Sequence, residues 1–344
     1  MVAGDDNTPG GRRRHARRVK IASLATHVPP RVMTNADLEK LVDTTDEWIR
    51  QRTGIVERHV VDPGVGTSDL IAPAAREAIA KAGLTPDDIG VIVVGTTTPD
   101  TVFPSTACLV QHKIGASRAW GFDLGAACSG FTYALTTAAE LVATGSHRHA
   151  LAVGADVMSS ILDYQDRATC VLFGDGAGVA VVSPAAEDEP AIIDFSHEID
   201  GSGGPALRLP AGGSLRPASH ETVDQRMHYV HQDGHAVFRF AVRKTEEICR
   251  CILARNAIDV DQLDLFVSHQ ANKRIIMSAA ERLGLDAAKV VINIERYGNT
   301  TGATIPLALG DALADGRLKK GDLVLLASVG AGFTVGSVLL RWAF

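Results

Sequence analysis

An internal repeat is the feature of this sequence that most restricts its fold. Residues 82–94 (AGLTPDDIGVIVV) align with residues 256–268 (NAIDVDQLDLFVS), and each segment shows the end of a helix, an acidic turn and an apolar strand. Residues 139–152 also align with residues 310–323, at an offset of 171 positions. A solenoid would need several shorter units. The sequence therefore predicts two similar halves that pack together as a pseudo-dimer.

Short apolar runs alternate with amphipathic segments along most of the chain. This alternation indicates an α/β protein with parallel sheets covered by helices. The halves are expected at residues 19–187 and 188–344, after a disordered basic tail at residues 1–18. The expected strands are residues 19–24, 89–94, 120–124, 150–153, 179–182 and 263–267, and two expected helices end near residues 83 and 143.

Composition excludes several classes of protein. The chain is 46% hydrophobic and 22% charged, with a formal charge of −6, which is unlike a disordered, collagen-like or disulfide-scaffold protein. A mildly acidic chain argues against general nucleic-acid binding. No apolar run approaches the roughly 20 residues that span a bilayer, so no membrane association is expected. Five irregularly spaced cysteines suit reduced thiols and a cytoplasmic location.

Cys128 is the candidate nucleophile. It lies in the segment GAACSG, between an expected strand and an expected helix. Small neighbours permit a sharp turn, and a helix N-terminus with its unpaired N–H groups favours a thiolate. A small buried hydrophobe is the alternative, and local features alone do not separate the two. Cys249 and Cys251 are spaced too closely for a zinc site, and no metal site is expected.

His269 and Asn299 are placed where they can act with Cys128. His269 follows the apolar strand at residues 263–267, and ligands collect beyond the carboxyl ends of strands in sheets of this class. Asn299 lies in a glycine-flanked turn, which alone indicates ordinary turn chemistry. The offset of 171, however, places Asn299 opposite Cys128. Pseudo-twofold packing would bring both residues to one centre.

Two glycine-rich segments have different interpretations. Residues 173–178 (FGDGAG) precede a strand and do not open a helix, so a dinucleotide-binding loop fails its context test. Close backbone packing is the better explanation for them. Residues 329–333 (VGAGF) form a turn near the C-terminus, whose exposed N–H groups can make an oxyanion site.

Three short motifs together resemble the active-site motifs of β-ketoacyl-[acyl-carrier-protein] synthase III, a family of the thiolase superfamily. They are residues 127–130 (ACSG), 268–272 (SHQAN) and 298–302 (GNTTG). The resemblance implies a thiolase-like five-layered αβαβα fold, a homodimer, and a condensing acyltransferase that begins fatty acid or related polyketide synthesis. It covers essentially the whole chain from about residue 19, including residues 46–55, 103–105, 173–178 and 330–333.

The resemblance assigns chemical roles to four residues. Cys128 would take the acyl group from an acyl-CoA thioester, and the backbone N–H groups of Cys128 and Ala331 would hold the oxyanion. Malonyl-acyl-carrier protein would then bind, and His269 and Asn299 would donate hydrogen bonds to its thioester carbonyl as carbon dioxide is lost. The carbanion would attack the acyl-cysteine. Acyl-CoA is a substrate in this scheme, so no cofactor is expected.

The resemblance also implies binding contacts. Trp48 and Arg52 match positions that sandwich the CoA adenine. Phe103 matches the residue that each subunit inserts into the acyl pocket of its partner. Arg239 and Arg274 match basic positions that meet the acidic carrier protein. Further contacts with CoA are implied at Thr44, Arg167 and Asn272.

Three positions depart from the family pattern. His235 stands where the family often has Asn, near the pantetheine arm. Ala331 replaces a common glycine, which matters little for a backbone donor. Glu281 replaces a common basic residue on the face that meets the carrier protein.

Other functions are less well supported by the sequence. A degradative thiolase needs a second catalytic cysteine near the C-terminus, and none follows Cys251. Chain-elongating ketosynthases typically use two histidines, and Asn299 stands in place of the second. A non-catalytic scaffold is disfavoured because all three active-site residues are present. A relative that transfers the acyl group to an alcohol, amine or other acceptor stays open as an alternative, and so does the identity of the acyl primer.

Overall fold

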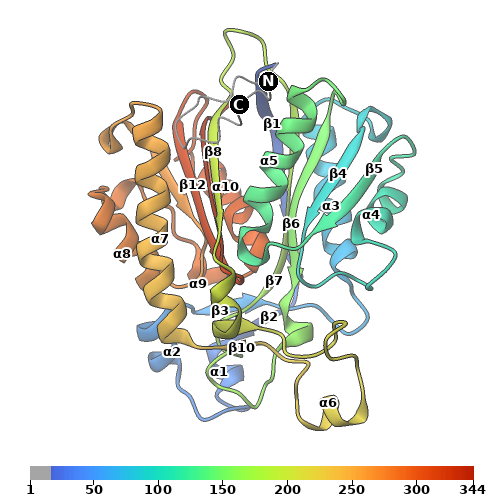
Figure 1. Cartoon of the computed structure of the whole chain (residues 1–344), viewed down its shortest axis with the longest axis vertical. Coiled ribbons are helices and arrows are strands. Elements are labelled where there is room, and N and C mark those ends of the chain that lie inside the picture. The colour runs from blue at the N-terminus through green and yellow to red at the C-terminus, as the bar shows by residue number, and fades with distance from the viewer. Residues whose placement is uncertain (1–16) are drawn as a thin grey trace, which may run out of the picture.

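The computed structural model describes residues 17–344 (Figure 1). The expected basic tail, residues 1–18, therefore lies outside the described residues except for its last two positions. Within residues 17–344, no helix is both long and apolar enough to cross a membrane.

Two sheets with the same strand order form the centre of the molecule. In the N-terminal half the order is β1-β7-β6-β4-β5, and in the C-terminal half it is β8-β13-β12-β11. Val290 pairs in parallel with Phe266 and takes the place of a fifth strand in the second sheet. The repeat predicted from the sequence is thus present in the topology. The strands are β1 (Val19–His27), β4 (Val91–Gly95), β5 (Trp120–Leu124), β6 (Ala150–Val157), β7 (Asp175–Pro184), β8 (Ile192–Ile199), β11 (Leu265–Ser268), β12 (Leu323–Gly330) and β13 (Thr334–Arg341).

The sheets are mixed, so the expectation of parallel sheets is wrong in part. β4 pairs in parallel with β5 and β6, as expected, but β7 runs antiparallel to both β6 and β1. A parallel pair needs a long crossover connection, usually a helix. The segment between β6 and β7 contains only the 3₁₀ helix η3 (Met158–Ile161), so the chain returns in the opposite direction.

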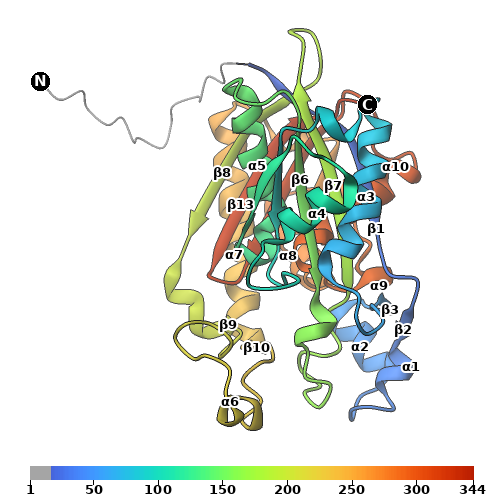
Figure 2. The ribbon, with the colours of Figure 1, turned by 90° about the vertical axis from the view of Figure 1, so that its right-hand side faces the viewer.

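Helices and sheets alternate in five layers, as Figures 1 and 2 show. One outer layer packs on the first sheet, two helices lie between the sheets, and the other outer layer packs on the second sheet. The central helices are surrounded by apolar contacts on both sides, which explains why almost all of their residues are apolar or small. The outer layers are α3 (Thr67–Lys81) with α4 (Thr106–Ile114), and α7 (Gly234–Arg255) with α8 (Lys273–Leu283); the central layer is α5 (Gly130–Ala143) with α10 (Thr304–Ala314).

Glycines permit the halves to approach closely at this centre. A Cβ added at Gly178 would lie 2.3 Å from the Cβ of Pro306 on α10, and one at Gly154 would lie 2.2 Å from the carbonyl oxygen of Gly302. Within residues 173–178, a Cβ added at Gly174 would lie 2.3 Å from the carbonyl oxygen of Tyr297, which confirms the interpretation of this segment as a site of close backbone packing.

Short elements cover the end of the two sheets that is lowest in Figure 1. At this end of the sheets, where β6 is followed by η3, these elements bring together residues that are distant in the sequence. They are β2 (Val32–Thr34), α1 (Asn35–Leu38), α2 (Asp46–Thr53), β3 (Glu57–His59), β9 (Leu207–Arg208), α6 (His220–Asp224), β10 (His231–Gln232) and α9 (Ile294–Tyr297).

Candidate active site

Two equivalent turns meet between the sheets. The 3₁₀ helix η2 (Ala127–Ser129) precedes α5, and η7 (Thr301–Ala303) precedes α10. Each begins with a non-glycine residue at positive φ, 46° at Ala127 and 47° at Thr301. Since left-handed backbone is uncommon outside glycine, these two residues are structural equivalents, and they are 174 positions apart.

The sequence offset used to pair Cys128 with Asn299 is therefore wrong at this point. With an offset of 174, Cys128 corresponds to Gly302, and Asn299 lies before the turn. The reason is a difference in helix length: α5 has 14 residues and α10 has 11. The offset between equivalent residues of the two halves is therefore 174 before these helices and 171 after them.

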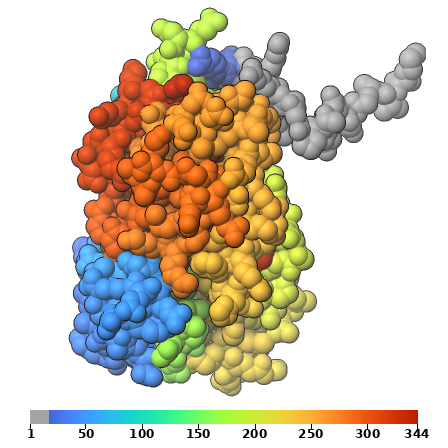
Figure 3. Space-filling view, turned by 90° about the vertical axis from the view of Figure 1, so that its left-hand side faces the viewer, coloured from blue at the N-terminus to red at the C-terminus, as the bar shows by residue number. Residues whose placement is uncertain are grey.

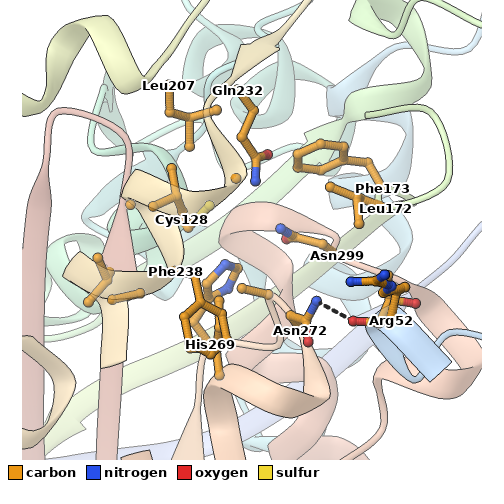
Figure 4. Close-up of a pocket in the computed structure, with 18 of the residues that line it drawn as sticks. Arg52, Cys128, Leu172, Phe173, Leu207, Gln232, Phe238, His269, Asn272 and Asn299 are labelled. Carbon is orange, nitrogen blue, oxygen red and sulfur yellow. Dashed lines mark hydrogen bonds between the residues drawn. The ribbon is translucent and has the colours of Figure 1, made fainter. Parts of the chain in front are cut away.

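The two residues nevertheless meet in one cavity, together with His269. The cavity has a volume of about 300 Å³ and is lined by residues of both halves. Figure 4 shows the three side chains around a single space. Trp48 and Arg52 also line it, so the cavity leads from the surface to the buried cysteine. Other lining residues are Phe173, Leu207, Gln232, Phe238, Asn272, Val329 and Gly330.

Cys128 is buried, with 7% of its surface exposed. Burial disfavours the anion and, with the nearby negative charge of Asp156, raises the pKa of the Cys128 thiol to about 12. The expectation of a resting thiolate is thus wrong: desolvation outweighs the favourable position before α5, and the resting residue is a thiol.

His269 directly follows β11, as predicted, and is also buried. Its Nδ1 lies 2.7 Å from Oγ1 of Thr304 on α10. Its Nε2 has no hydrogen-bond partner among residues 17–344. Burial lowers the pKa of His269 to about 3, because the imidazolium would lose its hydration. The ring is therefore neutral at pH 7, with one nitrogen free to interact with a substrate.

Asn299 has a defined orientation. Its Oδ1 accepts a hydrogen bond of 2.9 Å from the backbone N–H of Thr301. Because only the oxygen of a carboxamide can accept a hydrogen bond, this contact distinguishes the position of Oδ1 from that of Nδ2. The Nδ2 group is left as the hydrogen-bond donor of a side chain that lines the cavity. The main chain of Asn299 is held by Leu172 and Gly174 in the opposite half.

The glycine-rich C-terminal turn lies against the Cys128 turn, as expected for an oxyanion site. A Cβ added at Gly330 would lie 2.8 Å from the backbone N of Cys128. Thr334 Oγ1 donates to the carbonyl of Ala126 at 2.8 Å and ties the two turns together. Gly330 lines the cavity, whereas Ala331 is not among its lining residues. The role of Ala331 as the second oxyanion donor stays a prediction.

Of the residues expected to contact CoA, Trp48, Arg52 and Asn272 line the cavity, whereas Thr44 and Arg167 do not. The guanidinium of Arg167 lies 4.8 Å from the centre of the Trp48 ring, and that of Arg52 lies 6.0 Å away. Asn272 caps α8 and donates from Nδ2 to the carbonyl of Arg52 at 3.0 Å, which ties α2 to α8. The hydroxyl of Thr44 is buried and has no partner among the described residues.

Figure 3 shows the face on which the orange segments, which include α7 and α8, adjoin the N-terminal segment (blue). Arg239 and Arg274 are exposed, and Arg274 lies 5.6 Å from the ring of Phe238, which lines the cavity. Two of the family departures, His235 and Glu281, are exposed, and neither lines the cavity.

Phe103 does not reach the cavity of its own chain. It is 84% exposed, beside the equally exposed Val102. Trp120, on the edge strand β5 of the first sheet, is half exposed. Exposed large apolar side chains near an open sheet edge are typical of an interface. The insertion of Phe103 into a partner stays a prediction.

Sequence reasoning missed three residues behind the site: Asp156, Thr301 and Thr304. Each is buried and hydrogen-bonded to the Asn299 turn or to His269. Asp156 had a recognisable mark, because it is the one charged residue in the apolar run at residues 150–157. In residues 17–344, no group of three or more His, Cys, Asp or Glu side chains is arranged to hold a metal ion.

Comparisons with known proteins agree with this geometry. A family described as 3-oxoacyl-[acyl-carrier-protein (ACP)] synthase III matches residues 122–201, and its C-terminal part matches residues 253–342. The β-ketoacyl-[acyl-carrier-protein] synthase III of Solibacter usitatus is 60% identical over 95% of this chain and 99% of its own. The crystal structure of 3-oxoacyl-[acyl-carrier-protein] synthase III from Aquifex aeolicus is 41% identical, covers 94% of this chain and 100% of its own, and superposes with a TM-score of 0.87. The priming β-ketosynthase of the R1128 polyketide pathway is 34% identical, covers 97% of this chain and 99% of its own, and has a TM-score of 0.87.

Proposed function

This chain belongs to the 3-oxoacyl-[acyl-carrier-protein] synthase III family, and from that premise we propose how its cavity works. It is an acyl-transferring condensing enzyme. An acyl primer passes from acyl-CoA to Cys128, and decarboxylative condensation with malonyl-acyl-carrier protein then gives a 3-oxoacyl-acyl-carrier protein, CoA and carbon dioxide. One observation carries the proposal: a buried thiol, a neutral imidazole with a free nitrogen and a carboxamide donor share one cavity.

In the first half-reaction the thiol of Cys128 loses its proton as its sulfur attacks the thioester carbon. Free Nε2 of His269 is the acceptor that we propose for this proton, since it is buried in the same cavity without another partner. Negative charge develops on the thioester oxygen, where the backbone N–H groups of Cys128 and Ala331 would stabilise it. Collapse of this intermediate expels the CoA thiolate, which takes the proton back from His269. The products are acyl-cysteine and CoA.

In the second half-reaction malonyl-acyl-carrier protein loses carbon dioxide. The electron pair of the broken carbon–carbon bond forms an enolate, whose charge rests on the thioester oxygen. Nδ2 of Asn299 would donate a hydrogen bond to that oxygen. His269 would donate a second one from Nε2 after the neutral ring has changed tautomer, with its single proton moved from Nδ1 to Nε2 and Nδ1 then accepting from the Thr304 hydroxyl. The α-carbon then attacks the carbonyl carbon of the acyl-cysteine, the carbon–sulfur bond breaks, and Cys128 leaves as a thiolate that takes up one proton from solvent. Neutral, fixed donors suit this step because they stabilise the enolate without protonating it.

The entrance suits the nucleotide part of CoA. The resemblance pairs Trp48 with Arg52 around the adenine. A ring stacked between two planes needs about 7 Å between them, and the 6.0 Å from the Trp48 ring to the Arg52 guanidinium is nearer to this spacing than the 4.8 Å to Arg167. We propose that adenine lies between Trp48 and Arg52, as cations and aromatic faces both stack on such a ring. Arg167, Thr44 and Asn272 would contact neighbouring parts of CoA.

The proposal extends to partners and location. Arg239 and Arg274, exposed near the cavity, would meet the acidic carrier protein, and such charge complementarity accelerates encounter. A homodimer would cover the exposed Val102 and Phe103 and place Phe103 in the acyl pocket of its partner. Five unpaired cysteines support a cytoplasmic location. The solved polyketide priming ketosynthase shares the fold, so the proposal concerns the reaction and not the pathway that uses its product.

The proposal is tested by separating the two half-reactions in Asn299→Ala. Acylation of Cys128 by acetyl-CoA, measured by intact-protein mass, should continue, because it needs only the cysteine turn and His269. Carbon dioxide release from radiolabelled malonyl-acyl-carrier protein should fall by about 10²–10³-fold, the usual effect of removing one such donor. A variant that releases carbon dioxide normally but is not acylated would contradict this division. Wild-type protein that is acylated but never releases carbon dioxide would indicate transfer to another acceptor.

A further inference from the structure

Thr301 controls the orientation of the Asn299 carboxamide. Its backbone N–H donates to Asn299 Oδ1 at 2.9 Å, and it does so from a left-handed conformation with φ of 47°. That conformation is unfavourable for a β-branched residue. Surrounding contacts must therefore hold Thr301 in place if the carboxamide is to keep its orientation.

Asp156 supplies those contacts from the opposite half of the chain. Its carboxylate is fully buried at the end of β6. One oxygen, Oδ2, accepts from the hydroxyl of Thr301 and from the backbone N of Gly302 at 3.1 Å. The other oxygen, Oδ1, accepts from the hydroxyls of Thr96, Thr97 and Thr98 and from the backbone N–H groups of Thr97 and Thr98, at 2.7–3.2 Å. Oδ1 anchors the carboxylate in its own half, and Oδ2 holds the turn of the other half.

The charge of Asp156 does not assist the nucleophile. Its negative charge contributes to the raised pKa of the Cys128 thiol, and so it opposes formation of the thiolate. A buried carboxylate is also costly unless its oxygens are well hydrogen-bonded. The benefit of this residue must come from what its hydrogen bonds hold in position.

We propose that Asp156 is a positioning residue for decarboxylation: through Thr301 it fixes the Asn299 carboxamide with Nδ2 directed to the thioester oxygen. This inference rests on the proposed function. A purely structural role would instead affect stability and both half-reactions alike.

The test is a double-mutant cycle between Asp156→Asn and Asn299→Ala, with both half-reactions measured for each variant. The substitution replaces one of the two accepting oxygens of Asp156 with an NH₂ group, which cannot accept hydrogen bonds from the hydroxyl and N–H groups around it. Alone, Asp156→Asn should reduce carbon dioxide release by about 10–10²-fold, since a misplacement of about 1 Å can cost 10²-fold. Acylation of Cys128 by acetyl-CoA should not fall, because removing the negative charge of Asp156 makes the Cys128 thiol easier to ionise. In the Asn299→Ala background, Asp156→Asn should reduce carbon dioxide release by no more than about twofold, because its effect acts through the missing carboxamide.

A second pair of variants protects the test against misfolding of Asp156→Asn. Thr301→Val removes the hydroxyl at nearly constant shape and should show the same selective loss, whereas Thr301→Ser should recover most of the decarboxylation. Ser337→Ala is the matched control, because the Ser337 hydroxyl is buried without a partner among the described residues. Equal losses in both half-reactions, or full additivity with Asn299→Ala, would overturn the inference.

A crystal structure of Asp156→Asn, or of Thr301→Val, judges the inference independently of activity. We expect the contact between Thr301 N and Asn299 Oδ1 to be lost. An unmoved carboxamide would overturn the inference even if the reaction is the one proposed. Wild-type protein that releases no carbon dioxide would contradict the proposed function alone, and the crystal structure would still decide the role of Asp156.

Discussion

Acidification should destabilise this protein through His269 in a way that can be calculated from its burial. The pKa of His269 is about 3 in the folded chain and about 6.5 when unfolded. Below pH 6.5 the unfolded chain therefore binds a proton that the folded chain does not, and the free energy of unfolding decreases as the pH falls. At pH 5 the interval is 1.5 pH units at about 1.4 kcal/mol each, so the loss is about 2 kcal/mol.

The measurement is urea unfolding of the wild type and of His269→Asn at pH 7 and pH 5. The variant changes stability at both pH values for reasons of packing, but it has no imidazole to titrate at this position. The wild type should lose about 2 kcal/mol more than the variant between pH 7 and pH 5. His27 and His149, whose pKa values burial also lowers, titrate in both proteins and cancel. Equal losses in the two proteins would show that His269 titrates near its ordinary pKa, and the argument for a neutral buried imidazole would fail.

Two further outcomes follow from the site. Acetyl-CoA should label the buried Cys128 and not the exposed Cys108 or Cys251, which peptide mapping of wild type and Cys128→Ser decides; a label at another cysteine in the variant would contradict the assignment. Replacing Trp48 and Arg52 with Ala should raise the KM for acetyl-CoA by about 5–30-fold, as the loss of stacking contacts of about 1–2 kcal/mol predicts. Pre-acylated enzyme should condense with malonyl-acyl-carrier protein at a rate similar to wild type, and equal damage to both steps would count against a role in CoA binding.

The architecture could be predicted because the two halves carry glycines at equivalent turns, and these glycines can be aligned in the sequence. Gly145 and Gly316, which are aligned in the sequence, both have positive φ, 79° and 69°. Each glycine lies in the turn directly after a central helix, Gly145 after α5 and Gly316 after α10. Apolar runs identified β4 and β11 in the same way. The offset of 171 does not apply at Cys128, because α10 is three residues shorter than α5. The periodic apolar pattern of the sequence does not reveal this difference in length. The antiparallel β7 was missed for a related reason: a strand pattern does not reveal which way the chain returns.

The chemistry of the site was only partly predictable. Motifs identified Cys128, His269 and Asn299, since each follows a strand or precedes a helix within a distinctive segment. Their protonation states depend on burial, which comes from the packing of both halves and cannot be obtained from neighbours in sequence. A helix N-terminus in the sequence suggested a thiolate, but burial, together with the charge of Asp156, raises the pKa of the Cys128 thiol. Asp156 was missed because its role depends on a turn 145 residues away.

Burial acts on Cys128 and His269 in opposite directions, and the result constrains how acylation must proceed. It raises the pKa of the thiol to about 12 and lowers that of the imidazole to about 3. The resting pair is therefore neutral, and proton transfer before substrate binds would create two poorly solvated charges. The transfer becomes favourable only as the negative charge moves from sulfur to the thioester oxygen, where the proposed backbone donors would stabilise it. Proton transfer and attack should consequently be coupled. Because the thiolate is the reactive form of a cysteine, a neutral resting thiol should also react slowly with other electrophiles until acyl-CoA occupies the cavity.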